Sequence, residues 1–188
     1  MFSFLKSVFL PSPAAPVSQL ELQLRTVSIR GRLAYCTTCL ETAFLSEKIN
    51  LDALGGLLCA LWEFTSSSDL GVWEEKIINY YSESVLEEQS DEQNGLISVP
   101  FQQLKAAYSA LPAGLLQCID ETIDVGRGNL YGGTVGHSAD TLTPTTQVVR
   151  YMQASGYPLP PIERFLRSPF TQEDQHGWGK RVARSYFQ

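Results

Sequence analysis

The apolar residues of this chain recur every three or four positions along most of its length, and this spacing limits the fold more than any other feature. In the segment 29–45 they fall at Leu33, Cys36, Leu40, Ala43 and Phe44. Side chains at such intervals share one face of an α-helix, because the helix repeats every ~3.6 residues. The pattern predicts an all-α fold, an irregular bundle of about seven or eight helices that bury these faces against one another.

The bounds of the other expected helices are predicted from residues that commonly begin or end a helix. Asn50 is suited to cap a helix from residue 51 to about 65, whose wide apolar face is typical of a central buried helix. Pro144 is expected at the first position of another helix, and Gly156 just after its end. Residues 20–27, where leucines alternate with polar residues, could form one short N-terminal strand or a helix. The remaining expected helices span residues 70–81, 100–111, 115–126 and 162–166.

The length of 188 residues suits one domain. Such a chain buries roughly 70% of the surface that its unfolded form exposes, so it needs neither a disulfide nor a metal to stay folded. We expect a single helical domain over residues 19–188, after an apolar lead and Pro-rich linker over residues 1–18. The acidic stretch Glu87 to Gly95 is the best internal boundary. No apolar run approaches the ~20 residues of a membrane-spanning helix, so no membrane partner is predicted.

Negative charge is concentrated in one part of the sequence. The formal net charge of −6 argues against nucleic acid as a partner, since nucleic-acid binding depends on Lys and Arg at phosphates. Between Glu63 and Glu92 there are nine acidic residues and one basic residue. Such a segment can attract a basic protein, and a solvated helix face is the simpler alternative. The residues predicted to contact a partner here are Trp73, Glu74, Glu75, Glu87 and Glu88.

Four cysteines, Cys36, Cys39, Cys59 and Cys118, lie among apolar residues in the helical pattern. Cys36 and Cys39 match the C-x-x-C motif, but they fall in the middle of an expected helix, whereas redox enzymes place the motif at a helix N-terminus. Zinc would need two more ligands, and the other two cysteines are widely separated. We predict four buried cysteines without a ligand, no metal or other cofactor, and a reducing, cytoplasmic location.

Residues 126–138 read GRGNLYGGTVGHS, and five glycines in thirteen residues predict a loop. Glycine lets a backbone approach a ligand closely and leaves N–H groups free to bind an anion. The side chains that would contact such a ligand are Arg127, Tyr131 and His137. The loop has no Lys-Ser/Thr pair and no apolar strand before it, so a nucleotide-binding motif is absent. The alternative is an irregular connection that packs Leu130 and Tyr131 into the core.

The sequence shows no arrangement typical of a catalytic site. Its two histidines, His137 and His176, belong to no metal-binding pair such as H-E-x-x-H. His137, Ser138 and Asp140 are too close in sequence to face one another as a triad, and no nucleophile elbow is present. The stretch His176-Gly-Trp-Gly-Lys-Arg could stack on nucleic acid, but the acidity of the chain favours a Trp178 that packs against the domain.

Two classes of function follow from these features. The expected class is a non-enzymatic protein-binding domain, for example a bacterial antidote-type or immunity-type protein that covers a basic partner. The alternative is an enzyme or small-ligand binder that uses loop 126–138. A pocket onto which His137, Arg127 or Asp140 converges would favour the alternative, whereas a flat or convex acidic face over Glu63–Glu92 would favour the protein-binding domain.

Overall fold

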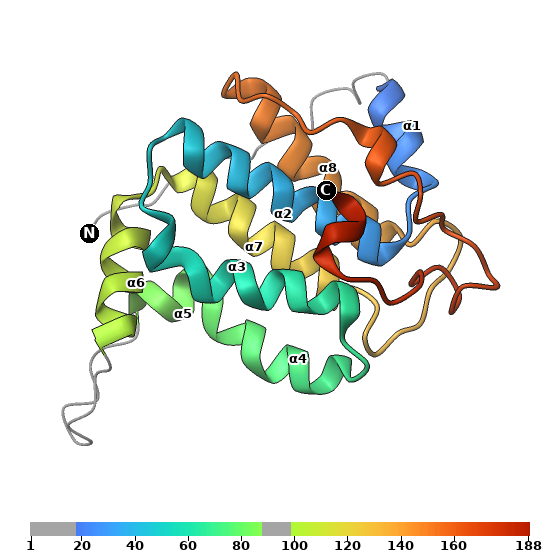
Figure 1. The fold of residues 1–188 in the computed structure, drawn as a ribbon, viewed down its shortest axis with the longest axis horizontal. Helices are drawn as coiled ribbons and strands as arrows, with labels where there is room; N and C mark the ends of the chain where they lie inside the picture. Colours follow the sequence, from blue (N-terminus) through green and yellow to red (C-terminus); the bar gives the residue numbers. More distant parts are fainter. Residues whose placement is uncertain (1–17, 88–98) are drawn as a thin grey trace, which may run out of the picture.

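In the computed structural model, helix α2 (Ile29–Ser46) runs through the middle of a bundle of helices (Figure 1). The structure describes residues 18–87 and 99–188. Residues 29–37 of α2 are buried without interruption, so this part of the helix is covered on all sides. The main neighbours of α2 are α3 (Leu51–Ser66), α7 (Ala113–Arg127) and α8 (Ala139–Ala154).

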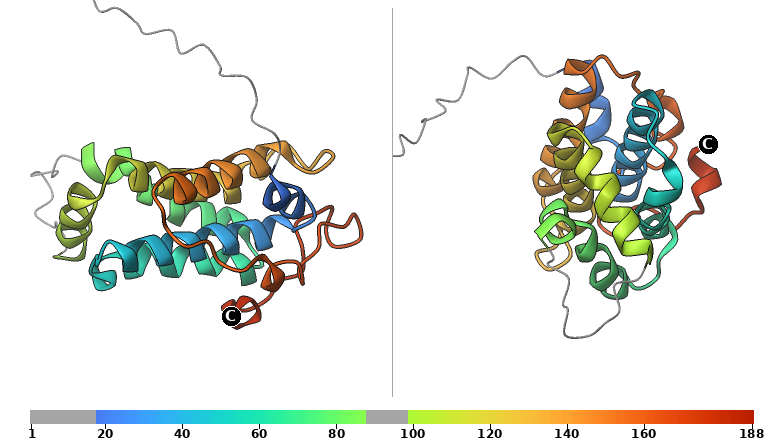
Figure 2. Two further views of the ribbon diagram at one scale, coloured as in Figure 1. Left: turned by 90° about the horizontal axis from the view of Figure 1, so that it is seen from above. Right: turned by 90° about the vertical axis from the view of Figure 1, so that its left-hand side faces the viewer.

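The bundle has two main layers. Helices α7 and α8 pair in one layer, and α2 and α3 form the other, as the view from above in Figure 2 shows. Helices α5 and α6 contact each other, and α4 packs against α3. The remaining elements are α1 (Gln19–Arg25), α4 (Leu70–Ile77), α5 (Ser82–Glu87), α6 (Val99–Ala110) and three 3-10 turns (Ile78–Tyr80, Ile162–Arg164 and Arg184–Phe187).

The all-α prediction is confirmed, since the described residues form eight α-helices and no strand. The segment that could have been a strand is helix α1. A capping box starts it: the side chain of Ser18 accepts the N–H of Glu21 at 3.1 Å, and the Glu21 carboxylate accepts the N–H of Ser18 at 3.1 Å. None of the helices in the described ranges is long and apolar enough to cross a membrane.

Two predicted helix ends are confirmed by their hydrogen bonds. The side chain of Asn50 accepts the N–H of Asp52 at 3.0 Å and so caps α3. Gly156 follows α8 with a φ of +72°, a left-handed conformation that glycine adopts without strain. The N–H of Tyr157 then bonds the carbonyl of Met152 at 2.9 Å, which is the Schellman pattern of helix ends.

The predicted start of α8 is wrong, and the predicted glycine-rich loop starts two residues too early. Helix α8 begins at Ala139, five residues before Pro144, because the Ser138 carbonyl already accepts helical hydrogen bonds. Pro144 therefore lies inside the helix, where it removes only the bond that its N–H would have given to Asp140. Helix α7 continues through Gly126 to Arg127, so these two residues belong to a helix rather than to the glycine-rich loop.

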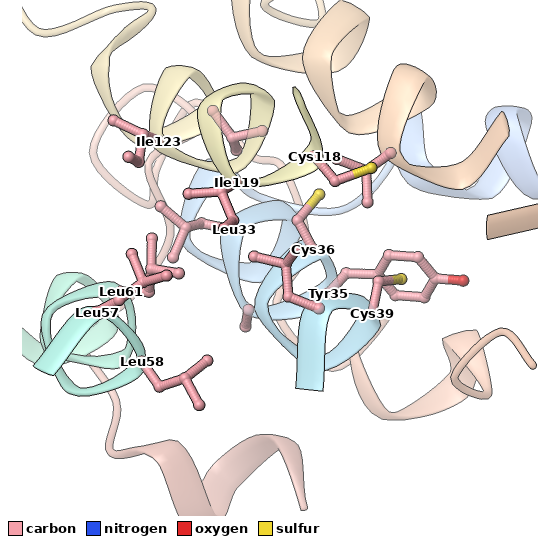
Figure 3. Close-up of a cluster of buried hydrophobic side chains, with 14 of the residues drawn as sticks. Leu33, Tyr35, Cys36, Cys39, Leu57, Leu58, Leu61, Cys118, Ile119 and Ile123 are labelled. Atoms are coloured by element: carbon pink, nitrogen blue, oxygen red, sulfur yellow. The ribbon is translucent and has the colours of Figure 1, made fainter. Parts of the chain in front are cut away.

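Apolar side chains of α2, α3 and α7 meet between the two layers (Figure 3). The predicted core residues Leu58, Leu61 and Trp62 are all buried. Helix α3 has the wide buried face that was expected, but it is not buried all round. It exposes Gly55 and Cys59, which lie one turn apart.

Three of the four cysteines are buried as predicted, namely Cys36, Cys39 and Cys118. Burial raises the pKa of the Cys118 thiol to about 12, and it raises the pKa of both other buried thiols as well, so all three stay protonated. The prediction for Cys59 is wrong, since it lies on the exposed face of α3. Among the described residues, no group of three or more His, Cys, Asp or Glu side chains is arranged to hold a metal ion.

Two arginines in the first turn of α2 are buried and bind backbone carbonyls. Arg32 donates to the carbonyls of Leu24 and Arg25, at 3.0 and 3.1 Å, which end α1. Arg30 donates to the carbonyls of Phe64 and, at 3.1 Å, of Ser67, which end α3. Each guanidinium thus satisfies the unpaired carbonyls at a helix C-terminus. Burial lowers the pKa of both to about 10, so they remain charged at neutral pH.

The segment after α8 covers the buried start of α2. The N–H groups of Ile29 and Arg30 donate to the carbonyls of Gly177 and Trp178, at 3.0 and 3.1 Å. The ring of Trp178 lies 6.2 Å from that of Phe64, which confirms the prediction that this tryptophan packs against the domain. The C-terminal part of the chain therefore belongs to the folded bundle.

Leu61→Ala should lower the free energy of unfolding by about 2–5 kcal/mol, because Leu61 is fully buried and the change leaves a cavity. Leu45→Ala is the matched control, since Leu45 is 63% exposed and its loss should cost less than about 0.5 kcal/mol. Denaturant unfolding of both variants checks the prediction. Equal effects of the two changes would show that the buried face of α3 is wrongly assigned.

Gly126→Ala and Gly55→Ala should change stability in opposite directions. A Cβ atom at Gly126 would lie 2.3 Å from the buried indole of Trp73, whereas nothing lies within 4 Å of one at Gly55. We expect Gly126→Ala to destabilise by about 1–3 kcal/mol through overpacking, and Gly55→Ala to stabilise by up to about 1 kcal/mol through helix propensity. Thermal and denaturant unfolding measure both, and stabilisation by Gly126→Ala would contradict the close packing of α4 on α7.

Candidate binding cleft

Glu74 of α4 joins the two regions that the sequence presented as separate sites. Its Oε1 accepts a hydrogen bond from Nε of Arg127 at 2.9 Å and forms an ion pair with the terminal nitrogen Nη2 at 2.8 Å. Its Oε2 accepts the hydroxyl of Tyr131. Helix α4 supplies the carboxylate, the end of α7 supplies the guanidinium, and the following loop supplies the phenol. Both oxygens of a carboxylate that is only 8% exposed are therefore satisfied.

The network continues from Arg127 to Tyr81 and Asp124. A terminal nitrogen of Arg127 donates to the hydroxyl of Tyr81 at 3.0 Å, and that hydroxyl donates to the Asp124 carboxylate. The guanidinium also lies 5.5 Å from the centre of the Tyr81 ring, a cation–π arrangement. Burial, together with the bond to Asp124, raises the pKa of Tyr81 to about 12, so the phenol keeps its proton. One arginine thus holds a glutamate and a tyrosine in fixed positions.

A cleft of about 580 Å³ lies beside this network. Its lining comes from α4, α7, the loop after α7 and the first turns of α8, and consists of Glu74, Glu121, Asp124, Arg127, Gly128, Tyr131, Ala139, Asp140, Thr143 and Pro144. Four of these residues are acidic, and the one basic residue, Arg127, is already paired with Glu74. The cleft is therefore concave and negatively charged.

Three acidic residues of the cleft form no ion pair within the part of the chain that the structure describes. Within residues 18–87 and 99–188, no Lys or Arg forms a salt bridge with Glu121, Asp124 or Asp140. Burial raises the pKa of Glu121 above its ordinary value, and the carboxylates of Asp124 and Asp120 add to this effect. A cation in the cleft would favour the ionised form and lower that pKa again. The electrostatics of the cleft therefore suit a positively charged group.

Glu74 behaves in the opposite way. The hydrogen bond from Tyr131 is the main cause that lowers the pKa of Glu74, and the bonds and charge of Arg127 lower it further, against the effect of burial. This carboxylate is therefore ionised at neutral pH and held in place by its two partners.

The structure corrects the predicted role of Trp73. Its side chain is fully buried, its Nε1 donates to the Ala60 carbonyl at 2.8 Å, and its ring packs on Phe64 at 4.7 Å. It faces inward because α4 presents this side to α3, so it is a core residue and cannot anchor a partner. Glu75 and Glu87 are exposed but line no part of the cleft, and Glu88 lies outside the described residues.

The predicted loop residues have different surroundings. Tyr131 is 86% exposed, so it is not packed into the core, and Arg127 is held at Glu74. His137 is exposed and lies outside the lining of the cleft. Its carbonyl accepts from Arg32 at 2.7 Å, and its ring meets the ring of Phe170 at 6.5 Å. Of the three, the structure brings Arg127 and Tyr131 together and leaves His137 elsewhere.

Two acidic residues of the site, Glu121 and Asp124, were not predicted as binding residues. One signal for them was available in the sequence. They lie three positions apart in an expected helix, and such residues share a face. Asp140 was expected at a ligand pocket around the loop, and it does line the cleft.

Searches against models of protein families, against curated proteins and against solved structures find no match to this chain. The site is therefore interpreted from its own chemistry.

Tyr131→Phe should raise the pKa of Glu74 toward its ordinary value, because the variant keeps the ring and loses the hydroxyl donor. Because the pKa of Glu74 is lower in the folded than in the unfolded state, its ionised carboxylate stabilises the protein at pH values above the unfolded-state pKa. This stabilisation is lost as the pH falls through the folded-state pKa. The stability difference between the two proteins should therefore shrink from neutral pH to about pH 3.

Carboxyl ¹³C NMR titration of Glu74, with unfolding measured at both pH values, checks this prediction. Tyr157→Phe is the control, since it removes a tyrosine–glutamate hydrogen bond to Glu47 elsewhere on the surface. An unchanged pKa of Glu74 in Tyr131→Phe would contradict the assigned bond.

Proposed function

We propose that this chain is a non-enzymatic protein-binding domain that receives a basic segment of a partner protein in the cleft between α4, α7 and α8. The observation that carries the proposal is the cleft itself, where three carboxylates that form no ion pair with the described residues line a space of about 580 Å³. An unpaired lysine or arginine side chain of a partner would supply the missing positive charge. Charge complementarity of this kind selects partners and speeds their association.

The surroundings of the cleft support a polypeptide as the ligand. Tyr131 is an exposed aromatic side chain at the cleft, and tyrosine is enriched at the centres of protein interfaces. Exposed acidic side chains outside the lining, such as Glu75 and Glu87, extend the negative surface and would steer a basic protein toward it. One version of this function is a bacterial antidote-type protein that covers a basic toxin in the cytoplasm, where cysteines stay reduced.

A small cationic ligand is the second candidate, and the concave shape of the cleft favours it. Ligand pockets commonly have volumes of roughly 300–1,000 Å³, a range that includes this cleft. Arg127 and Asp140 contribute to the lining. These are two of the three residues expected to converge on a ligand pocket at the loop, and the third, His137, lies outside the lining.

Glu121→Gln/Asp124→Asn/Asp140→Asn should weaken binding of a fluorescein-labelled octa-arginine peptide about tenfold at low salt, chiefly by slowing association. The variant removes three negative charges and keeps the size of each side chain. The effect should fall as salt rises, because the Debye length shortens from ~10 Å at 0.1 M to ~3 Å at 1 M. Stopped-flow kinetics across a salt series measures this effect. Glu74 is left intact, since it is buried and paired.

The matched control is Asp52→Asn/Glu163→Gln/Glu173→Gln, which removes the same charge from exposed positions outside the lining of the cleft. Equal effects of the two triple variants would show that net charge, not the cleft, governs binding. Binding of free arginine as tightly as the peptide would favour the small-ligand candidate. No binding of the peptide to the unaltered protein at low salt would contradict the proposed function.

A further inference from the structure

Tyr131 occupies an unusual position for an aromatic side chain. Its side chain is 86% exposed, yet its hydroxyl is bonded to a carboxylate that is almost completely buried. Tyr131 and Glu74 both line the cleft, so their hydrogen bond forms part of its wall between the loop and α4. This bond joins the loop tip, residues 131–136, to the rigid flank of the cleft.

Both ends of the loop are fixed by buried polar groups. At the first end, the side-chain amide of Asn129 donates to the Gly133 carbonyl at 2.6 Å and to Asp140 at 3.2 Å. At the second end, Arg32 donates to the carbonyls of His137 and Ser138, at 2.7 and 3.2 Å. Because Gly133 itself lies within the tip, movement of the loop is confined to the residues on either side of it, 131–132 and 134–136.

The tip itself is held by a small number of hydrogen bonds. Nothing lies within 4 Å of a Cβ atom placed on Gly132, Gly133 or Gly136, so side chains of other segments do not crowd these glycines. Gly133 and Gly136 have positive φ angles, which glycine can change at little cost. The Gly133 carbonyl accepts from Asn129, the Val135 carbonyl accepts the N–H of Ser138, and the hydroxyl of Thr134 donates to the His176 carbonyl. Among the described residues, the bond of Tyr131 to Glu74 is the hydrogen bond that joins the tip to α4.

We propose that Tyr131 is a latch on the acidic cleft: its bond to Glu74 holds the loop tip closed, and a cationic side chain of the partner displaces the hydroxyl from Glu74 and opens the tip. This inference rests on the proposed function, because the displacing group is the basic side chain that the cleft receives. Guanidinium and ammonium groups form stronger hydrogen bonds with a carboxylate than a neutral phenol does. The exchange needs no unfavourable charge change, since Glu74 remains ionised and Tyr131 remains neutral.

Tyr131→Phe tests the latch without requiring a ligand. In the unaltered protein, the backbone amides of residues 131 and 132, which precede the anchored Gly133, should have NMR order parameters near the rigid value of about 0.85, and in Tyr131→Phe they should fall below about 0.6. Tyr157→Phe is the matched control, since it also removes a hydroxyl bonded to a glutamate, at 2.6 Å, on another face. It should leave the order parameters of the loop unchanged.

The second measurement is the association rate of the labelled octa-arginine peptide. If the closed tip limits entry of the peptide and is about tenfold more populated than the open tip, release of the tip in Tyr131→Phe should speed association by up to about tenfold. Tyr157→Phe should bind at the unaltered rate. Faster association together with a looser tip supports the latch.

The two proposals fail in different ways. Order parameters that are already low in the unaltered protein, or unchanged in Tyr131→Phe, overturn the latch whether or not the peptide binds. A looser tip with unchanged or slower association also overturns it, because Tyr131 would then be only a contact residue. No peptide binding to the unaltered protein contradicts the proposed function instead.

Discussion

The guanidinium of Arg32 is completely buried, and the described part of the chain offers it no carboxylate. Five oxygen acceptors surround it, and they belong to the end of α1, the end of the glycine-rich loop and the first turn of α8. A buried charge costs several kcal/mol unless such bonds compensate it. The three segments must therefore come together for the structure to be stable, and the loop beside the cleft is positioned as one consequence.

A second constraint fixes the cleft from the other side. Gly126 has no side chain, so the indole of Trp73 can approach α7 at a distance that a Cβ atom would prevent. The next residue along each helix is a member of the ion pair, Glu74 on α4 and Arg127 on α7. The apolar contact between Trp73 and Gly126 therefore also brings Glu74 and Arg127 together at the surface. The site depends on the core packing directly beneath it.

This dependence explains which features the sequence could predict. Helical periodicity is a local property, so it revealed the all-α fold and the buried face of Leu58, Leu61 and Trp62. Caps such as Asn50 are also local. The buried position of Trp73 and the exposure of Cys59 depend on which helix face meets a neighbour, and periodicity in a short helix cannot decide that. The pairing of Glu74 with Arg127, 53 positions away, follows only from the packing of α4 on α7.

The distribution of charge bears on function as well as on stability. The chain has 14 basic residues, enough to neutralise a cleft with three unpaired carboxylates. Several of them are used elsewhere instead: Arg30 and Arg32 bind helix ends, and Arg184 pairs with Glu41 while lying over Trp62. Like charges that stay together in a concave site cost stability, which binding sites commonly sacrifice for function. Burial and, to a smaller extent, the nearby carboxylates of Asp124 and Asp120 raise the pKa of Glu121, and the proposed entry of a basic side chain would relieve this repulsion. The same charges that weaken the free protein would therefore add to the affinity of its complex.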